Sequence, residues 1–300
     1  MNTYKLYQVD SFTKEKFRGN PAGVVLNADG LTDEQMQIIA REMNCSEAAF
    51  ILSPTGKDHD VWMRYFTPTT EIPLCGHATI AAHYIRAQEN KLQSSTVLTK
   101  TGVGTLQVDI IQEENDYKII FALGDIKFGH SLKDNDLDQL VKALGIKKSD
   151  LDPRCPVQFV SSGHTRFMVG INKKTILNNL APDLSALAAF SKKHNSQAYF
   201  LFTFDTGKKE ILTTSRMFAP ALGINEDPVT GDGNGPLGAY LVHNKLVKTD
   251  SKLFKFTGMQ GEAIGRTGFV DVTITIKNGE PNKVRVGGNA VIVFQTTMEI

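Results

Sequence analysis

The sequence predicts a mixed α+β fold made of two related domains, and an internal repeat, the chain length and the composition all point to it. A segment at residues 64–83 recurs in altered form at residues 216–238. Arg64, Phe66 and Pro68 match Arg216, Phe218 and Pro220 at one offset, whereas Glu71, Pro73 and Gly76 match Glu226, Pro228 and Gly231 at an offset three residues larger. One duplication with a three-residue insertion indicates two similar domains rather than a solenoid.

Length, charge and cysteine content limit the class of protein. The chain has 300 residues, a net charge of +1 and three cysteines. This length allows two domains of ordinary size, and the charge gives no reason to expect nucleic acid or an anionic membrane as a partner. With no apolar leader and an odd, sparse set of cysteines, we expect a cytoplasmic protein. A homodimer is a possible assembly.

The first half of the chain alternates between predicted strands and helices. Residues 4–9 and 22–26 are predicted as strands, followed by a helix that Thr32 caps and Gln35 completes as a capping box. The strand 60–66 leads into the first glycine turn, after which residues 78–85 form a helix. The alternating segments 97–101, 105–111 and 117–122 are predicted as strands of a half-buried sheet.

The second half echoes the first. An amphipathic helix at 134–144, closed by Gly145, opens it. Residues 163–170 echo 19–26, the segment 183–194 echoes the Thr32 helix, and 195–201 echoes 44–51 in an alignment that places Glu47 opposite Gln197. The remaining predicted elements are a helix at 236–242 and strands at 269–276, 284–286 and 291–294.

A glycine turn precedes a predicted apolar helix in both copies of the repeat. Cys75 and Gly76 lead into one helix, and Thr230 and Gly231 lead into the other. Glycine lets a ligand approach the backbone, and the N–H groups at a helix start suit a carboxylate or phosphate. The two turns either bind an anionic small molecule from both sides or only connect strands to core helices. Their repetition favours binding.

Glu47 is the candidate acid/base residue, because the repeat carries it only once. Its aligned counterpart, Gln197, is neutral, and its neighbours Ala48, Ala49 and Phe50 are apolar. An apolar environment favours the protonated form of a carboxyl group, which suits a general acid or base. The alternative is a surface glutamate at the start of a strand.

Three further side chains are candidates for contact with a substrate. His77, at a helix start, could donate to a substrate oxygen, Asp227 could accept from an amine or hydroxyl group, and Cys75 could be an activated thiol. Their structural alternatives are a partnered buried histidine, an ordinary Asp-Pro turn and an inert core cysteine. A two-base racemase site would need a second cysteine, but Thr230 stands at that position.

Neither a metal nor a cofactor is predicted. The seven histidines are scattered, without metal-ligand spacing beside cysteines or paired carboxylates. Residues 233–238 match the dinucleotide fingerprint G-x-G-x-x-G. However, no clean apolar strand precedes this stretch and Pro236 lies inside it, so we discount the match.

Several short motifs occur in order along nearly the whole chain. They are Asp10-Ser-Phe12 with Gly19-Asn-Pro-Ala-Gly-Val24, Ser46-Glu-Ala-Ala-Phe50, Phe66-Thr-Pro68 with residues 71–79, residues 226–231 with Gly235-Pro-Leu237, Gln260-Gly261, Gly265-Arg266 and Val286-Gly-Gly-Asn-Ala290. In these motifs the chain resembles the PhzF-like family of phenazine biosynthesis, which shares the diaminopimelate epimerase fold.

The resemblance implies two pseudo-symmetric domains. Each is a β-barrel-like sheet wrapped around a central helix, with the active site in the cleft between the domains. The first domain is expected at residues 1–123 plus 288–300, where the last strand returns, and the second at residues 124–287.

The resemblance also implies roles for individual residues. Glu47 corresponds to the family's proton-transferring residue, while Gly76, His77 and Asp227 help to hold and orient the substrate. Thr230 and Gly231 keep the family's Thr-Gly pair.

Asp232 replaces the serine that usually follows this pair in the family. An anion at a helix start suits the helix dipole but would repel a substrate carboxylate.

The preferred interpretation is a cofactor-independent isomerase that moves a proton on a small carboxylic or amino acid. Glu47 would act as general acid and base, with amides at the two helix starts stabilising negative charge. The alternatives are a thiol-assisted epimerase or racemase that uses Cys75, and a non-catalytic protein that binds a small molecule.

Overall fold

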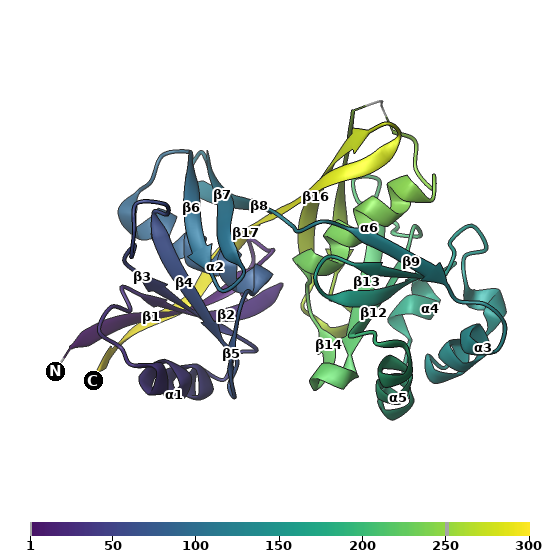
Figure 1. The fold of residues 1–300 in the computed structure, drawn as a ribbon, viewed down its shortest axis with the longest axis horizontal. Coiled ribbons are helices and arrows are strands. Elements are labelled where there is room, and N and C mark those ends of the chain that lie inside the picture. The colour runs from purple at the N-terminus through teal and green to yellow at the C-terminus, as the bar shows by residue number, and fades with distance from the viewer. Residues whose placement is uncertain (1, 250–251) are drawn as a thin grey trace. The chain divides into compact units, whose positions relative to one another are not determined.

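The structure is a computed structural model that describes residues 2–249 and 252–300. The chain forms two compact units, one of Met1–Ala122 with Gly287–Ile300 and the other of Leu123–Val286. Both chain ends lie in the first unit, because the first strand, β1 (Thr3–Ser11), pairs antiparallel with the last strand, β17 (Glu280–Glu299) (Figure 1). The chain therefore leaves the first unit once and returns to it along β17.

Eight strands of the first unit form a closed barrel. In order around the barrel they are β1, β2 (Asn20–Leu26), β3 (Ala48–Leu52), β4 (Val61–Phe66), β6 (Ser95–Thr101), β7 (Gly104–Glu113), β8 (Asp116–Ala122) and β17, which pairs again with β1. The pairs β2–β3 and β4–β6 are parallel. Closing the barrel gives every one of these strands two neighbours.

Helix α2 (Gly76–Asn90) is the central helix of this unit. It contacts β1, β2, β3, β7 and β8, and ten of its fifteen residues are buried. A helix that is apolar nearly all round is expected to be buried. The predicted helix at 78–85 is confirmed and extends further at both ends.

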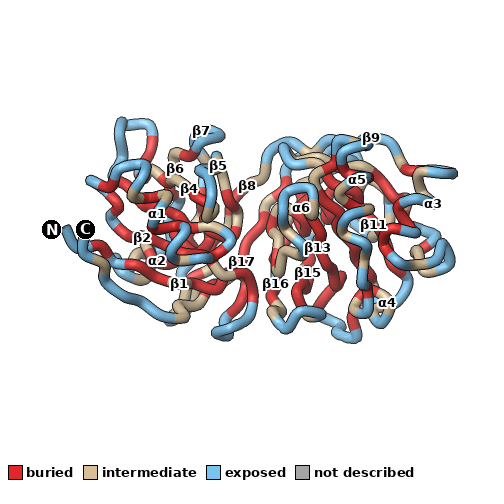
Figure 2. The backbone as a smooth tube through the Cα atoms, turned by 90° about the horizontal axis from the view of Figure 1, so that it is seen from below, coloured by how far each residue is buried: buried red, intermediate tan, exposed pale blue. Residues whose placement is uncertain are grey.

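Helix α1 (Asp33–Met43) packs against β3 and β4. The predicted capping box is present: Gln35 N–H donates to Thr32 Oγ1 at 3.2 Å, and Thr32 N–H donates to Gln35 Oε1 at 2.9 Å. The buried face of α1 joins the aromatic pair Phe50 and Phe66 in one core cluster. In the first unit, Figure 2 shows the buried residues concentrated along the strands and α2.

The second unit repeats this plan. Its strands are β10 (Gln158–Ser161), β11 (Thr165–Gly170), β12 (Ala198–Thr203), β13 (Thr213–Ala219), β15 (Leu253–Gln260) and β16 (Gly268–Lys277). Each strand in this list pairs with the next, and the five pairs are antiparallel, parallel, antiparallel, parallel and antiparallel. The strands β1, β2, β3, β4, β6 and β7 of the first unit pair in the same sequence of directions. Helices α5 (Leu184–His194) and α6 (Gly231–His243) take the places of α1 and α2 in this order. The predicted pseudo-symmetry is therefore present in the pairing of the strands.

The three-residue insertion of the second copy lies between Pro220 and Glu226, in a connection that contains a short 3₁₀ helix. In the first unit, a turn at Thr67–Thr70 joins β4 to β5 (Glu71–Ile72). In the second unit, the 3₁₀ helix Pro220–Leu222 followed by Gly223 lies between β13 and β14 (Ile224–Asp227). The remaining elements are β9 (Lys127–Ser131), α3 (Asp134–Ala143), α4 (Lys174–Asn178) and 3₁₀ helices at Lys148–Asp150 and Glu262–Ile264.

The glycines of residues 233–238 serve packing rather than nucleotide binding. They lie in α6, which contacts β10, β15 and β16. A Cβ atom at Gly233 would lie 2.3 Å from the Phe200 ring, and one at Gly238 would lie 2.9 Å from Phe256 and Val272. Glycine is therefore required where this helix approaches the strands closely.

Two predicted boundaries were wrong. The predicted strands 284–286 and 291–294 are parts of the single strand β17, and the helix predicted from Pro236 begins at Gly231. Proline favours a helix start, which misplaced that boundary. Among the described residues, no helix combines the length and the apolar character needed to cross a membrane.

Candidate active site

Three of the predicted side chains meet in the first unit. Glu47 directly precedes β3, Cys75 is the N-cap of α2, and His77 is the second residue of α2. Because α2 packs against β3, these residues come together although Glu47 lies far from the others in sequence. One polar side-chain atom of each residue lies within 4.8 Å of those of the other two.

His77 is the middle member of this cluster. Its Nε2 lies 3.3 Å from Glu47 Oε2 and 3.4 Å from Ser46 Oγ, and its Nδ1 lies 3.4 Å from Cys75 Sγ. The side chains of His77 and Glu47 are 9% and 13% exposed. The result is a largely buried row of carboxylate, imidazole and thiol.

Hydrogen bonds to their main-chain carbonyls hold all three residues in place. Ser11 Oγ donates to the His77 carbonyl at 2.7 Å, Thr79 Oγ1 donates to the Cys75 carbonyl at 2.7 Å, and Gly23 N–H donates to the Glu47 carbonyl at 3.0 Å. Each bond fixes the main chain next to a side chain of the cluster, which positions these side chains for chemistry.

The spacing of histidines along the chain did not reveal that His77 lies near both Cys75 and Glu47 in the fold. Cys75 and His77 are only two residues apart in the sequence, and the fold adds Glu47 from the position directly before β3. Contacts between a strand and a distant helix start are not visible in sequence spacing.

The structure also corrects the residue that corresponds to Glu47 in the second unit. Helices α1 and α5 both end at an asparagine in the left-handed conformation, Asn44 and Asn195. In the strand that follows each helix, Ala48 pairs with Phe66 in the first unit, and Tyr199 pairs with Phe218 in the second. Because Phe66 and Phe218 are equivalent in the repeat, Ala48 corresponds to Tyr199, and residues 44–48 match residues 195–199 at the same offset as Asn44 and Asn195.

With this offset, Glu47 corresponds to Ala198 and Gln197 corresponds to Ser46. The predicted match between Glu47 and Gln197 was therefore one residue out. Glu47 remains a carboxylate that only one copy of the repeat carries.

In the second unit, the turn before α6 is cross-linked by Gln260. Its Oε1 accepts from Thr230 N–H at 3.0 Å, and its Nε2 donates to the Asp227 carbonyl at 2.9 Å. Thr230 Oγ1 donates to the Asp227 carboxylate. These bonds fix Asp227 and Thr230 next to Gly231, where α6 begins.

Asp232 is the second residue of α6 and is held by three donors. Arg166 Nη2 donates to its Oδ2 at 2.7 Å, His164 Nδ1 lies 3.1 Å from the same oxygen, and Ser162 Oγ donates to Oδ1. Burial alone would raise the pKa of Asp232, but the charge of Arg166 and the hydrogen bonds from His164 and Ser162 lower it. The carboxylate is therefore ionised and paired.

This pairing bears on the expectation that Asp232 would repel a substrate carboxylate, because the Asp232 carboxylate has a charged partner within the protein. The Arg166 side chain is 1% exposed and compensates the charge of Asp232. Sequence reasoning missed Arg166, although an arginine within an otherwise largely apolar strand was a visible signal.

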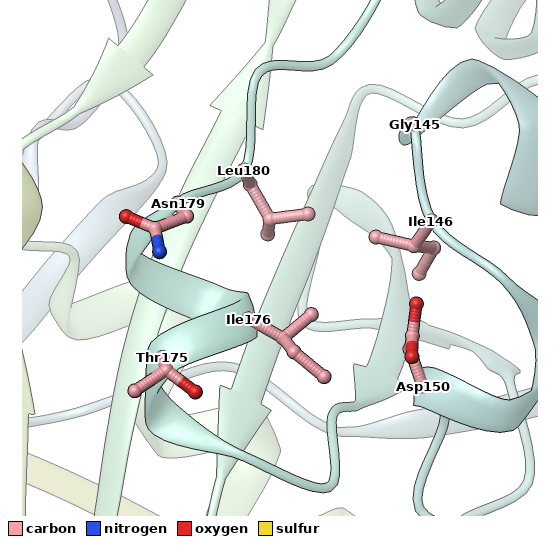
Figure 3. Close-up of a pocket in the computed structure, with 7 residues that line it drawn as sticks. All are labelled: Gly145, Ile146, Asp150, Thr175, Ile176, Asn179 and Leu180. Atoms are coloured by element: carbon pink, nitrogen blue, oxygen red, sulfur yellow. The ribbon is translucent and has the colours of Figure 1, made fainter.

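A cavity of about 290 Å³ lies elsewhere in the second unit (Figure 3). Its lining comes from the segment after α3, from α4 and from the two residues after α4, and consists of Gly145, Ile146, Asp150, Thr175, Ile176, Asn179 and Leu180. Asp150 accepts from its neighbour Lys147 N–H at 2.8 Å. None of the predicted site residues lines this cavity, so we assign the chemistry to the Glu47 cluster instead.

Comparisons with known proteins agree with this geometry. Residues 9–296 match the family model of phenazine biosynthesis-like proteins, PhzC-PhzF. An uncharacterized isomerase of Clostridium acetobutylicum is 54% identical over 295 residues, which are 98% of each chain. A trans-2,3-dihydro-3-hydroxyanthranilate isomerase of Pseudomonas chlororaphis is 29% identical over 290 residues, 97% of each chain.

A solved structure of a PhzF-family phenazine biosynthesis protein from Bacillus anthracis covers all of both chains, with a TM-score of 0.90 at 29% identity. These matches confirm the resemblance drawn from the motifs, and the names of the relatives confirm the predicted enzyme class, isomerase.

Proposed function

Because this chain belongs to the family of phenazine biosynthesis-like proteins, we propose that it isomerises a small carboxylic or amino acid by moving a proton, with Glu47 as general acid and base. In this proposal Glu47 removes a proton from a substrate carbon and returns it to another carbon. The chemistry needs no cofactor, because a carboxylate can perform both transfers.

The observation that carries the proposal is the 3.3 Å approach of Glu47 Oε2 to His77 Nε2 in a largely buried setting. A general acid or base must be held within reach of the proton it transfers, and a neighbouring polar group can fix its orientation. His77 is the residue that we propose orients Glu47 and contacts a substrate oxygen. Amides at the start of α2, including that of Gly76, would stabilise negative charge on the substrate.

The proposed reaction uses a single base. The second unit has Ala198 at the position of Glu47 and Thr230 at the position of Cys75, so neither equivalent position supplies a base. A single base returns the proton to the face from which it was taken. We therefore expect a change in the position of a double bond rather than an inverted carbon centre.

In the second unit, we propose that Asp227, Thr230, Gly231 and Asp232 contribute to substrate binding. The helix start at Gly231 offers amides to an acid group. The hydrogen bonds of Asp227 and Thr230 to Gln260 support this role by fixing the turn.

The test is turnover and solvent-deuterium incorporation for the wild type and Glu47→Gln. Because one relative is named a trans-2,3-dihydro-3-hydroxyanthranilate isomerase, that compound is the first candidate substrate, followed by a panel of small carboxylic and amino acids. Ligands are chosen by thermal stabilisation, since binding to the native state raises its stability. Turnover of Glu47→Gln should fall by about 10²–10⁴-fold with unchanged melting, because the amide cannot accept the proton.

The matched control is Glu42→Gln, which removes one carboxylate from an exposed position at the end of α1. This variant should retain wild-type turnover and deuterium incorporation. A folded Glu47→Gln protein with near-normal turnover would falsify the proposal.

A second candidate is a thiol-assisted epimerase, favoured by the 3.4 Å distance from Cys75 Sγ to His77 Nδ1. A thiol beside an imidazole can ionise and act as a base. In this case Cys75→Ala would lose turnover as severely as Glu47→Gln, and the product would be an epimer. Retained turnover in Cys75→Ala would exclude this candidate.

A further inference from the structure

The Glu47, His77 and Cys75 cluster has the ligand types of a zinc site. Zinc binds thiolate sulfur at about 2.3 Å, imidazole nitrogen at about 2.0–2.1 Å and carboxylate oxygen at about 2.0–2.2 Å. Tetrahedral angles then place the ligand atoms roughly 3.3–3.6 Å apart. The closest approaches are 3.3 Å from Glu47 Oε2 to His77 Nε2 and 3.4 Å from Cys75 Sγ to His77 Nδ1, which are different ring nitrogens, and one ligand atom of each residue lies within 4.8 Å of those of the other two.

One movement is needed to form such a site. His77 now presents a different ring nitrogen to each neighbour, whereas a metal binds one nitrogen. The ring must therefore turn so that one nitrogen faces both partners, and the ligand atoms, which lie within 4.8 Å of one another, must close in. Hydrogen bonds to the His77, Cys75 and Glu47 carbonyls hold the main chain, so we expect this movement to come from side-chain rotations.

Ligand chemistry selects the kind of ion. A thiolate, an imidazole and a carboxylate suit zinc and similar thiophilic divalent ions, whereas magnesium and calcium require oxygen ligands. The thiolate and the carboxylate together would balance the charge of a divalent ion.

We propose that Glu47, Cys75 and His77 bind one zinc ion, with solvent as the fourth ligand, and that the bound ion inhibits the enzyme. On binding, the Cys75 thiol releases its proton to solvent and the Glu47 oxygen donates its lone pair to the metal. That oxygen can then no longer accept a substrate proton. Metal binding itself does not depend on the proposed function, but the inhibition does.

The test is titration of the metal-free protein with cobalt(II) as a spectroscopic probe and with zinc by calorimetry. We expect one equivalent of each ion to bind, with a thiolate-to-cobalt charge-transfer band that zinc displaces. Cys75→Ala should abolish the band and weaken zinc binding at least tenfold. His77→Ala and Glu47→Gln should also weaken zinc binding.

The matched controls are Cys45→Ala and Cys155→Ala, because the chain has three cysteines. Cys155 is a suitable comparison, since burial, with a smaller contribution from Asp152, raises the pKa of its thiol to about 12. Both controls should keep the band and the zinc affinity. Melting curves would verify that each variant is folded.

Failure to bind one equivalent, or a cobalt band that persists in folded Cys75→Ala, would overturn the metal site. If zinc binds but no substrate is turned over, the metal site stands and the proposed function fails. If a substrate is found, zinc should inhibit the wild type and a chelator should restore activity. Full activity with one zinc bound would overturn the inhibition.

Discussion

Ala198, the first residue of β12, occupies in the second unit the position that Glu47, directly before β3, occupies in the first. Ala198 pairs with Arg166 across β11 and β12, and the Arg166 side chain reaches Asp232. Asp232 in turn corresponds to His77, because Gly76 and Gly231 both begin their helices. At equivalent helix positions, the first unit thus pairs an imidazole with a carboxylate, and the second unit pairs a carboxylate with a guanidinium.

This difference separates the roles of the two units. An imidazole and a carboxylate can each take up and release a proton during a reaction, whereas a guanidinium remains protonated. The first unit therefore carries the groups suited to proton transfer, and the Arg166–Asp232 pair is a fixed ion pair. The duplication has kept the backbone of the helix start and replaced the chemistry at its second residue.

Asp232→Ser should destabilise the protein, because the buried Arg166 guanidinium would lose its charged partner. Breaking a buried ion pair by removing one partner costs about 3–5 kcal/mol, and we expect the lower end because Asp232 is 26% exposed. The free energy of unfolding is measured with urea. Sulfate should stabilise Asp232→Ser more than the wild type, since an anion can replace the lost carboxylate.

The control is Asp33→Ser, which removes a 75% exposed carboxylate from the first turn of α1. It should change stability by less than about 1 kcal/mol. Equal effects of the two substitutions, or no extra effect of sulfate on Asp232→Ser, would contradict the assignment of Asp232 as the partner of Arg166.

His83 should make the stability of the first unit depend on pH. It is fully buried in α2, and burial, with a smaller contribution from the charge of Arg86, lowers the pKa of its imidazole to about 3. Its Nε2 lies 2.9 Å from Thr99 Oγ1. Between about pH 6.5 and 3 the unfolded chain therefore binds a proton that the folded protein excludes.

The stability that neutral His83 provides is complete above about pH 6.5 and declines as the pH falls towards 3. One such group contributes a slope of up to about 1.4 kcal/mol per pH unit. Urea unfolding between pH 7 and 4.5 should show a shallower slope for His83→Gln than for the wild type. The comparison of slopes remains valid even if the substitution lowers stability at every pH, and parallel slopes would refute the prediction.

The repeat could be predicted from the sequence because its landmarks are glycines, prolines and charged residues at fixed spacing. The insertion before Glu226 and the two central helices followed from the same landmarks. Their positions are set by local chemistry, namely turn residues and caps, which one sequence displays directly.

The correspondence between Glu47 and Ala198 could not be predicted in this way. The short similar segments after Asn44 and Asn195 can be aligned in two ways that differ by one residue. The pairing of Ala48 with Phe66 and of Tyr199 with Phe218 decides between the two alignments. A shift of one residue in a strand turns every side chain to the other face, so only the register fixes the counterpart. The contact of Arg166 with Asp232 likewise depends on packing across 66 residues of chain.

The last prediction compares Arg216 with Arg64, the equivalent arginines of the repeat. Arg216 binds Glu226 through two hydrogen bonds of 2.9 and 2.7 Å, and its Nη1 donates to the Leu177 and Leu180 carbonyls at 3.0 Å. Arg64 binds Glu71 through two bonds of 2.7 Å. The Glu226 side chain is 12% exposed and the Glu71 side chain is 45% exposed, so the Arg64–Glu71 pair lies closer to solvent.

Lysine cannot reproduce the two parallel bonds of arginine. Arg216→Lys should therefore lower the free energy of unfolding by about 3 kcal/mol, since it disrupts a buried pair and leaves carbonyls without a donor. Arg64→Lys should lower it by no more than about 1 kcal/mol, because water replaces the lost bonds. Circular dichroism is the appropriate measurement, since the single tryptophan, Trp62, lies beside Arg64 and would report on the first unit alone. A larger loss for Arg64→Lys than for Arg216→Lys would show that burial of the ion pair does not set its contribution to stability.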